Sequence, residues 1–435
     1  MEVFSSYTII IACSLIIIVS YLFNSISRKT SVPSVLMLIV LGVIINKILF
    51  FSGYKNINFL PTLELLGIIG LIMIVLEAAL DLELTKEKWP IIWKSLLVSV
   101  LSLVACSFLI AIVIQVFFNK GLFVSMIYAI PLSIMSSAIV IPSVSNLSEH
   151  KKEFMIYEAT FSDILGIMFF YFLIGSVNAE THIQLAWMIF GNVFVTVLLS
   201  IIVSYVLIIV FQKLKSNIKL FLLIAVLLVL YSLGKLMHLS SLLIILMFGL
   251  VLNNRKLFFR GFMKKHVNIE TMNDIYKNFK LVTLETSFVV RTFFFVIFGI
   301  TIVLSSLLNI KVVLVSGLIL GILFGIRIIF LYLIVRKDII PQAFIAPRGL
   351  ITILLFFSIP LDIKEQFEEF KPGILLFVII ISSLLMSWIL IRHSKAKKLK
   401  EEIEKDFPEE ISNENIETNG VSKNIENLEN DKLTN

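Results

Sequence analysis

The sequence has 435 residues, of which 58% are hydrophobic and 15% are charged, and its formal net charge is +7. Its mean hydropathy is +1.00. A soluble globular protein of this length cannot bury so much apolar surface, so the composition predicts an all-α polytopic membrane protein. The sequence contains no phosphate-binding glycine loop and no nucleophile motif, and it gives no reason to expect an enzyme or ATP-driven transport.

Apolar runs of about 20 residues predict about thirteen transmembrane helices. We place these spans at residues 6–24, 33–51, 63–80, 91–118, 122–147, 153–176, 183–211, 217–234, 240–254, 281–306, 310–335, 341–361 and 372–392. Lys and Arg gather in one set of alternate loops, for example at Lys151, Lys152, Lys264 and Lys265, whereas the other loops hold few. Because basic loops stay in the cytoplasm, we predict an external N-terminus and a cytoplasmic C-terminus.

Three parts of the chain differ in composition. Residues 1–395 form the predicted membrane transporter domain, and within it the basic residues 255–280 are predicted to form a cytoplasmic linker. Residues 396–435 are rich in Glu and Asn and poor in aromatic side chains, so we predict a disordered, acidic cytoplasmic tail.

The chain contains a weak internal repeat. Residues 32–46 (VPSVLMLIVLGVIIN) resemble residues 239–253 (LSSLLIILMFGLVLN), which lie in the second and ninth predicted spans. Because the offset between these spans is odd, the two stretches cross the membrane in opposite directions, which predicts two inverted repeats. The alternative is chance similarity between two apolar helices.

The same offset relates the fifth span to the twelfth, and both spans are interrupted. The fifth contains Ser136 and Ser137, and the twelfth contains Pro347, Arg348 and Gly349. We therefore predict two crossed, discontinuous helices. Such broken helices, at corresponding positions of two repeats, are where secondary transporters bind their ions.

The sixth span carries two carboxylates, Glu158 and Asp163, on the same wide helix face as Ser162. A carboxylate at membrane depth is costly, so it marks a functional site by default. Asp163 can hold either a proton or a monovalent cation, and this competition is sufficient for antiport. Ser162 can lend a hydroxyl oxygen to a hard cation. The alternative for Asp163 is a structural hydrogen bond within the helix bundle.

Glu158 needs a positively charged partner if it stays ionised. The candidates are Arg327, Arg348 and Arg291, and none of these guanidinium groups can lose its charge. Arg348 can also offset the helix-end dipoles where the two broken spans cross. We interpret Glu77 as a hydrated residue at the end of the third span.

Several motifs resemble the cation/proton antiporter superfamily, and most closely its NhaP-like and NHE-like sodium/proton exchangers. They are PSVLMLIVLG in the second span, LGIIGLIMIVLEAALDLEL in the third, FGIRIIF in the eleventh and APRGLITILL in the twelfth. The family's Glu-Ser-x-x-Asn-Asp motif is matched in part by Glu158, Ala159, Ser162 and Asp163. The resemblance covers residues 1–395.

This resemblance implies that Asp163 binds both the cation and the proton, that Glu158 pairs with Arg327, and that Arg348 lies at the helix crossing. It also implies a homodimer. Spans 1–3 and 8–10 would form the dimerisation scaffold, and spans 4–6 and 11–13 would form an ion-carrying core that moves like an elevator.

The sequence departs from the family pattern in the fifth and sixth spans. The family's Thr-Asp-Pro is replaced by Ser136, Ser137 and Ala138, so Ser137 supplies no charge. Electrogenic relatives carry two adjacent aspartates, whereas Ser162 precedes Asp163 here, which favours electroneutral exchange. These changes also leave the cation selectivity open.

We therefore expect a secondary antiporter of the plasma membrane that exchanges Na⁺ or Li⁺ for H⁺. The transported cation is its only expected metal, and we expect no cofactor and no nucleic-acid partner. Its partners would be small inorganic cations, the lipid bilayer and a second copy of the chain. The alternatives are a K⁺/H⁺ antiporter and a membrane sensor or channel that does not exchange ions.

Overall fold

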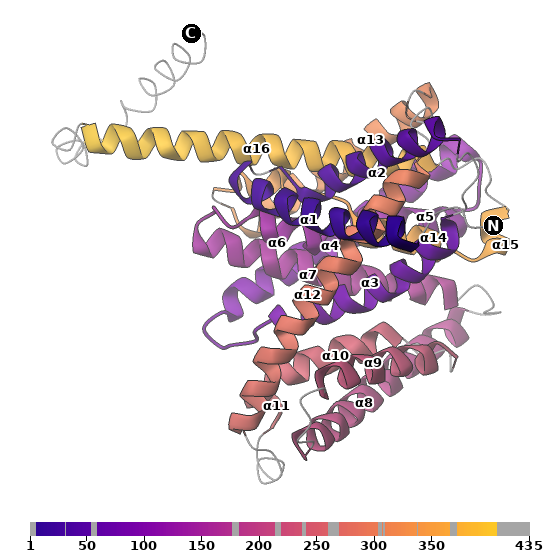
Figure 1. The fold of residues 1–435 in the computed structure, drawn as a ribbon, viewed down its shortest axis with the longest axis vertical. Coiled ribbons are helices and arrows are strands. Elements are labelled where there is room, and N and C mark those ends of the chain that lie inside the picture. The colour runs from indigo at the N-terminus through magenta and orange to yellow at the C-terminus, as the bar shows by residue number, and fades with distance from the viewer. Residues whose placement is uncertain are drawn as a thin grey trace. The chain divides into compact units, whose positions relative to one another are not determined.

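The computed structural model describes residues 6–30, 32–53, 59–175, 182–213, 219–236, 241–259, 269–302, 307, 309–336, 338–365 and 372–406, and the regular structure in these residues is helical. The helices of the first half are α1 (Ser6–Thr30), α2 (Ser34–Phe51), α3 (Leu60–Asp81), α4 (Trp89–Phe118), α5 (Leu122–Ser133), α6 (Ser137–Ser143), α7 (Glu149–Gly175) and α8 (His182–Lys213) (Figure 1). The second half contains α9 (Lys219–Leu236), α10 (Ser241–Asn253), α11 (Arg255–Phe258), α12 (Ile269–Thr301), α13 (Ile310–Ile334), the 3₁₀ helix η3 (Gln342–Phe344), α14 (Leu350–Phe357), α15 (Leu361–Glu365) and α16 (Pro372–Asp406).

Helical segments account for the predicted spans. Within the described residues, ten segments are long and apolar enough to cross a bilayer, and α9 and α10 supply two shorter apolar helices. The predicted fifth span is divided into α5 and α6, and the twelfth into η3 and α14. The prediction of an all-α membrane protein with two discontinuous helices is therefore confirmed.

The two polar segments predicted from composition are partly described. The predicted linker, residues 255–280, contains α11 and the start of α12, and its residues 260–268 lie outside the described part. The first residues of the predicted tail, as far as Asp406, continue α16, and residues 407–435 lie outside the described part. The chain divides into two compact units, Met1–Ser387 and Trp388–Asn435, and the first unit holds the membrane helices as far as Ser387 in α16.

Helix packing in the first unit reflects the internal repeat. The second span, α2, packs against the tenth, α12, and the ninth span, α10, packs against the third, α3 (Figure 1). A Cβ atom on Gly42 would lie 2.1 Å from the carbonyl oxygen of Val296, and a Cβ atom on Gly249 would lie 2.5 Å from the Cβ atom of Ala79. Gly42 and Gly249 are matched positions of the repeat. Both inverted halves therefore use a glycine to bring two helices close together.

A second group of helices packs around α4, which contacts α5, α7 and α13. The helix breaks lie beside this group: residues 134–136 separate α5 from α6, and residues 345–349 separate η3 from α14. Pro347 favours an extended conformation for the residue before it, which opposes a continuous helix at the second break. Helix α14 contacts α5, α7 and α3, so it lies between the two groups.

The close contact at Gly42 gives a test of this packing. We expect Gly42→Ala to lower the melting temperature of the purified protein in detergent, because the added methyl group meets the backbone of α12. Overpacking of this kind costs about 1–3 kcal/mol. Gly321→Ala is the matched control, since nothing lies within 4 Å of its added Cβ atom. Equal melting temperatures for the two variants would contradict the packing described.

Candidate functional site

The two interrupted helices touch at their breaks. The backbone N–H of Ser136 donates to the carbonyl oxygen of Pro347 at 2.9 Å. A Cβ atom on Gly349 would lie 2.8 Å from Ser136 Oγ and 2.7 Å from Ile139 Cδ1, so a larger residue would push the two segments apart. This contact brings the extended residues of both breaks together.

Arg348 satisfies the carbonyl groups that these breaks leave without helical partners. Its guanidinium group donates to the carbonyl oxygens of Leu132 at 2.8 Å, Ser133 at 3.2 Å and Ala346 at 2.7 Å. The side chain is only 3% exposed. Because Leu132 and Ser133 end α5, the positive charge faces the negative end of that helix dipole. Arg348 therefore contacts both interrupted helices where they meet.

Glu158 and Arg327 form a buried ion pair. Arg327 Nη1 donates to Glu158 Oε1, and Nη2 donates to Oε2 at 2.9 Å. Arg327 Nε also donates to the carbonyl oxygen of Gln342 at 3.0 Å. The pair thus links α7 to α13 and anchors η3, the first part of the interrupted twelfth span. Of the three candidate arginines, Arg327 is the one that contacts Glu158 in the described residues.

Arg291 has a different partner, which sequence reasoning missed. Its Nη2 atom lies 3.6 Å from Glu77 Oε1, and Ser287 donates a hydrogen bond to the same carboxylate. Lys280 forms a second ion pair between the same two helices, with Asp81 at 2.6 Å. Glu77 is therefore part of the α3–α12 contact. The available sequence signal was the four-residue spacing of Glu77 and Asp81 on one face of the third span.

Asp163 lies beside the first break and is 2% exposed. Its Oδ2 atom accepts a hydrogen bond from the backbone N–H of Ser137 at 3.1 Å, and the Ser137 side chain also interacts with the carboxylate. Ser162 Oγ accepts a hydrogen bond from the backbone N–H of Met135 at 2.9 Å. The predicted residues Asp163, Ser162, Ser136 and Ser137 thus gather around one extended segment.

Two oxygen atoms at this break have no hydrogen-bond partner in the described residues. They are Asp163 Oδ1 and Ser136 Oγ, and both are buried. Buried polar atoms normally have partners, so such a pair is consistent with a site that accepts a proton or a cation. The described residues contain no group of three His, Cys, Asp or Glu side chains that could hold a metal ion. A cation at this site would therefore be held by one carboxylate and neighbouring neutral oxygens.

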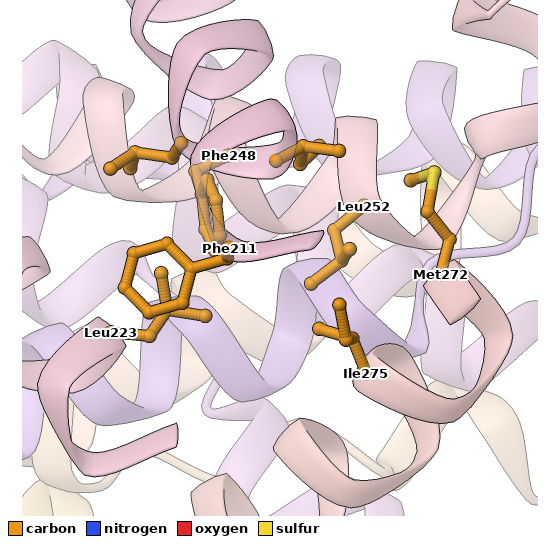
Figure 2. Close-up of a pocket in the computed structure, with 8 residues that line it drawn as sticks. Phe211, Leu223, Phe248, Leu252, Met272 and Ile275 are labelled. Atoms are coloured by element: carbon orange, nitrogen blue, oxygen red, sulfur yellow. The ribbon is translucent and has the colours of Figure 1, made fainter. Parts of the chain in front are cut away.

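A small pocket elsewhere has the opposite chemistry. It lies where α8, α9, α10 and α12 meet, and Figure 2 shows Phe211, Leu223, Phe248 and Leu252 among its lining residues. All of the lining side chains are apolar. They offer no oxygen ligand for an ion, so this pocket is part of the hydrophobic packing.

A buried carboxylate where two interrupted membrane helices cross is typical of a secondary ion transporter. The sequence also matches the family model described as "Sodium/hydrogen exchanger, transmembrane" over residues 14–392. This chain therefore belongs to the transmembrane sodium/hydrogen exchanger family, a family of cation/proton antiporters. The resemblance predicted from the sequence motifs is confirmed.

Solved structures give the same assignment of the fold. The sodium proton antiporter MjNhaP1 from Methanocaldococcus jannaschii at pH 8 matches with a TM-score of 0.65 and 19% identity, over 90% of this chain and 96% of that chain. An electron-microscopy structure of the same antiporter matches with a TM-score of 0.64 and 18% identity, over 91% of this chain and 98% of that chain. No curated protein matches the sequence.

Removal of Arg327 tests whether the buried Glu158–Arg327 ion pair stabilises the folded protein. We expect Arg327→Ala to reduce the yield of folded protein and its melting temperature in detergent, because it leaves Glu158 buried without a partner. Breaking a buried pair in this way costs about 3–5 kcal/mol. The double variant Glu158→Gln with Arg327→Gln removes both charges and should recover part of the loss. An unchanged melting temperature for Arg327→Ala would show that the pair is dispensable.

Proposed function

We propose that this protein is an electroneutral antiporter that exchanges Na⁺ or Li⁺ for H⁺ at Asp163. The observation that supports this proposal best is the buried Asp163 carboxylate at the helix crossing, with Oδ1 unpartnered in the described residues. Ser136 and Ser162 would supply neutral oxygen ligands, and Ser137 would orient the carboxylate through its backbone N–H.

Competition for one carboxylate couples the two ions. A proton or a monovalent cation neutralises Asp163, and the site can then cross the apolar barrier. An empty, ionised Asp163 resists this movement, because moving an unpaired charge through an apolar environment carries a large desolvation cost. Each crossing in one direction therefore carries a cation, and the return crossing carries a proton.

The charges around the site favour an electroneutral cycle. Glu158 is neutralised by Arg327, and the residue before Asp163 is Ser162, which accepts a hydrogen bond from Met135 N–H. One titratable carboxylate is thus available at the break. One proton exchanged for one monovalent cation moves no net charge.

We assign the moving core to α4–α7, α13, α14 and α16 as far as Ser387, and the dimerisation scaffold to α1–α3, α9, α10 and α12. The packing of α4 against α5, α7 and α13, and of α12 against α2 and α3, supports two such groups. We propose a homodimer in the plasma membrane. The distribution of Lys and Arg supports an external N-terminus and a cytoplasmic C-terminus.

K⁺/H⁺ exchange is a second candidate. The observation that favours it is the replacement of the family's Thr-Asp-Pro by Ser136, Ser137 and Ala138, which removes an acidic side chain from the fifth span. A site with fewer charged ligands holds a small, strongly hydrated cation less tightly, so it discriminates less against K⁺.

Asp163→Asn tests the proposed carrier. In proteoliposomes with a preset pH gradient, we expect Na⁺ or Li⁺ to dissipate the gradient through the wild-type protein and not through this variant, because an amide cannot exchange a proton for a cation. Asp362→Asn is the matched control at an exposed position and should exchange normally. Sustained exchange by Asp163→Asn would refute the assignment, and dissipation by K⁺ alone would favour the second candidate.

A separate experiment tests whether each exchange cycle moves net charge across the membrane. We expect the initial rate of Na⁺-dependent H⁺ movement to stay the same when a K⁺ diffusion potential of either sign is imposed with valinomycin. An electroneutral cycle has no net charge on which the potential can act. A rate that rises with one sign of the potential and falls with the other would show that the exchange is electrogenic.

A further inference from the structure

The short connection between α3 and α4 joins the proposed scaffold to the proposed core, and one side chain from the scaffold holds it. Asn254, which follows α10, accepts a hydrogen bond from Leu84 N–H at 2.6 Å through Oδ1. Its Nδ2 group donates to the carbonyl oxygen of Leu82 at 2.8 Å. Asn254 is 7% exposed. The Asn254 amide therefore forms one accepted and one donated hydrogen bond with the backbone of the connection, the pattern that a neighbouring β-strand would form.

The core holds the same connection from the other direction. Tyr157 of α7 donates a hydrogen bond to the carbonyl oxygen of Glu83 at 2.6 Å. Lys88 at the start of α4 adds ion pairs with Glu83 at 3.2 Å and with Glu153 of α7 at 3.0 Å. Consecutive backbone groups of Leu82, Glu83 and Leu84 are thus bound alternately to the scaffold and to the core.

The ammonium group of Lys88 does not itself make this contact a pH switch. The hydrogen bond to Glu153 raises the pKa of Lys88 above its ordinary value. The ammonium group consequently stays charged throughout the physiological pH range.

Apolar side chains also pack around this connection between the scaffold and the core, which we call the seam. Leu82, Ile92 and Tyr157 form a buried cluster, and the partly buried Phe161 and Leu250 pack against it. The rings of Tyr157 and Phe161 stack with their centroids 6.3 Å apart. Phe161 precedes Asp163 by two residues on α7, and the basic loops assign this end of α7 to the cytoplasm. The cluster therefore lies nearer the cytoplasmic end of α7 than Asp163 does.

We propose that the Tyr157 hydroxyl and the Asn254 amide form a cytoplasmic latch, which holds residues 82–84 between α7 of the core and α10 of the scaffold and keeps this seam together in the conformation described. Movement of the core against the scaffold breaks the Tyr157–Glu83 hydrogen bond, whereas Asn254 keeps the connection attached to α10. Both act as positioning residues, because neither touches the transported ion. This inference rests on the proposed antiport for its place in the cycle.

The test measures access to the seam without measuring transport. In a variant in which Cys13 and Cys106 are replaced by Ser, Leu250→Cys reports on the cluster through its labelling by a membrane-impermeant maleimide applied to inside-out vesicles. We expect Tyr157→Phe to raise the labelling rate about two- to tenfold, the range expected for loss of one hydrogen bond. Asn254→Ala should also raise it, and provides a second variant if Tyr157→Phe does not fold.

Ser232→Ala is the control, because the Ser232 hydroxyl donates to the carbonyl oxygen of Leu228 at 2.9 Å within α9 and makes no contact with residues 82–84 or Asn254 in the described residues. This control should leave the labelling rate of the Leu250→Cys variant unchanged. Unchanged labelling in folded Tyr157→Phe and Asn254→Ala variants would overturn the latch. If labelling rises but no cation moves protons in proteoliposomes, the latch stands and the proposed antiport fails.

Discussion

The guanidinium group of Arg348 is the interaction on which the rest of the site depends. Two membrane helices are interrupted where they cross, and the carbonyl groups freed by the interruptions are buried, so they need hydrogen-bond donors from the protein. Arg348 binds carbonyl groups of both breaks. The Ser136–Pro347 hydrogen bond and the close approach at Gly349 then fix the distance between the two segments. This frame places the backbone N–H of Ser137 against Asp163.

The other intramembrane charges are arranged under the same constraint. Glu158 is paired with Arg327, and Glu77 with Arg291, so each of these carboxylates has a cationic partner. Asp163 instead accepts a hydrogen bond from a backbone N–H and retains an unpartnered oxygen in the described residues. Glu158 and Glu77 thus have cationic partners within the protein, whereas in the proposed cycle the charge of Asp163 is compensated by a mobile ion. This difference separates the clamp residues from the proposed carrier.

Features that depend on local chemistry could be predicted from the sequence. Ser136 and Ser137 marked the break in the fifth span, and the offset of the internal repeat pointed to the twelfth span, where Pro347 and Gly349 lie. Features that depend on how one helix is rotated against another could not be predicted from the sequence. The Glu77–Arg291 pair, the Asn254 contacts and the hydrogen bond from Met135 N–H to Ser162 each join residues whose facing positions no local pattern specifies. In particular, Ser162 appeared from its position to be a simple cation ligand, yet its oxygen also supports the break.

Antiport at Asp163 requires that a proton and a cation exclude each other at this carboxylate. Isothermal titration of the detergent-purified protein with NaCl, LiCl or KCl, in buffers of different ionisation enthalpy and at several pH values, measures this exclusion directly. We expect cation binding to release protons, so that the observed heat depends on the buffer and the apparent affinity weakens as the pH falls. Cation binding that is independent of both the buffer and the pH would contradict exchange at a shared carboxylate.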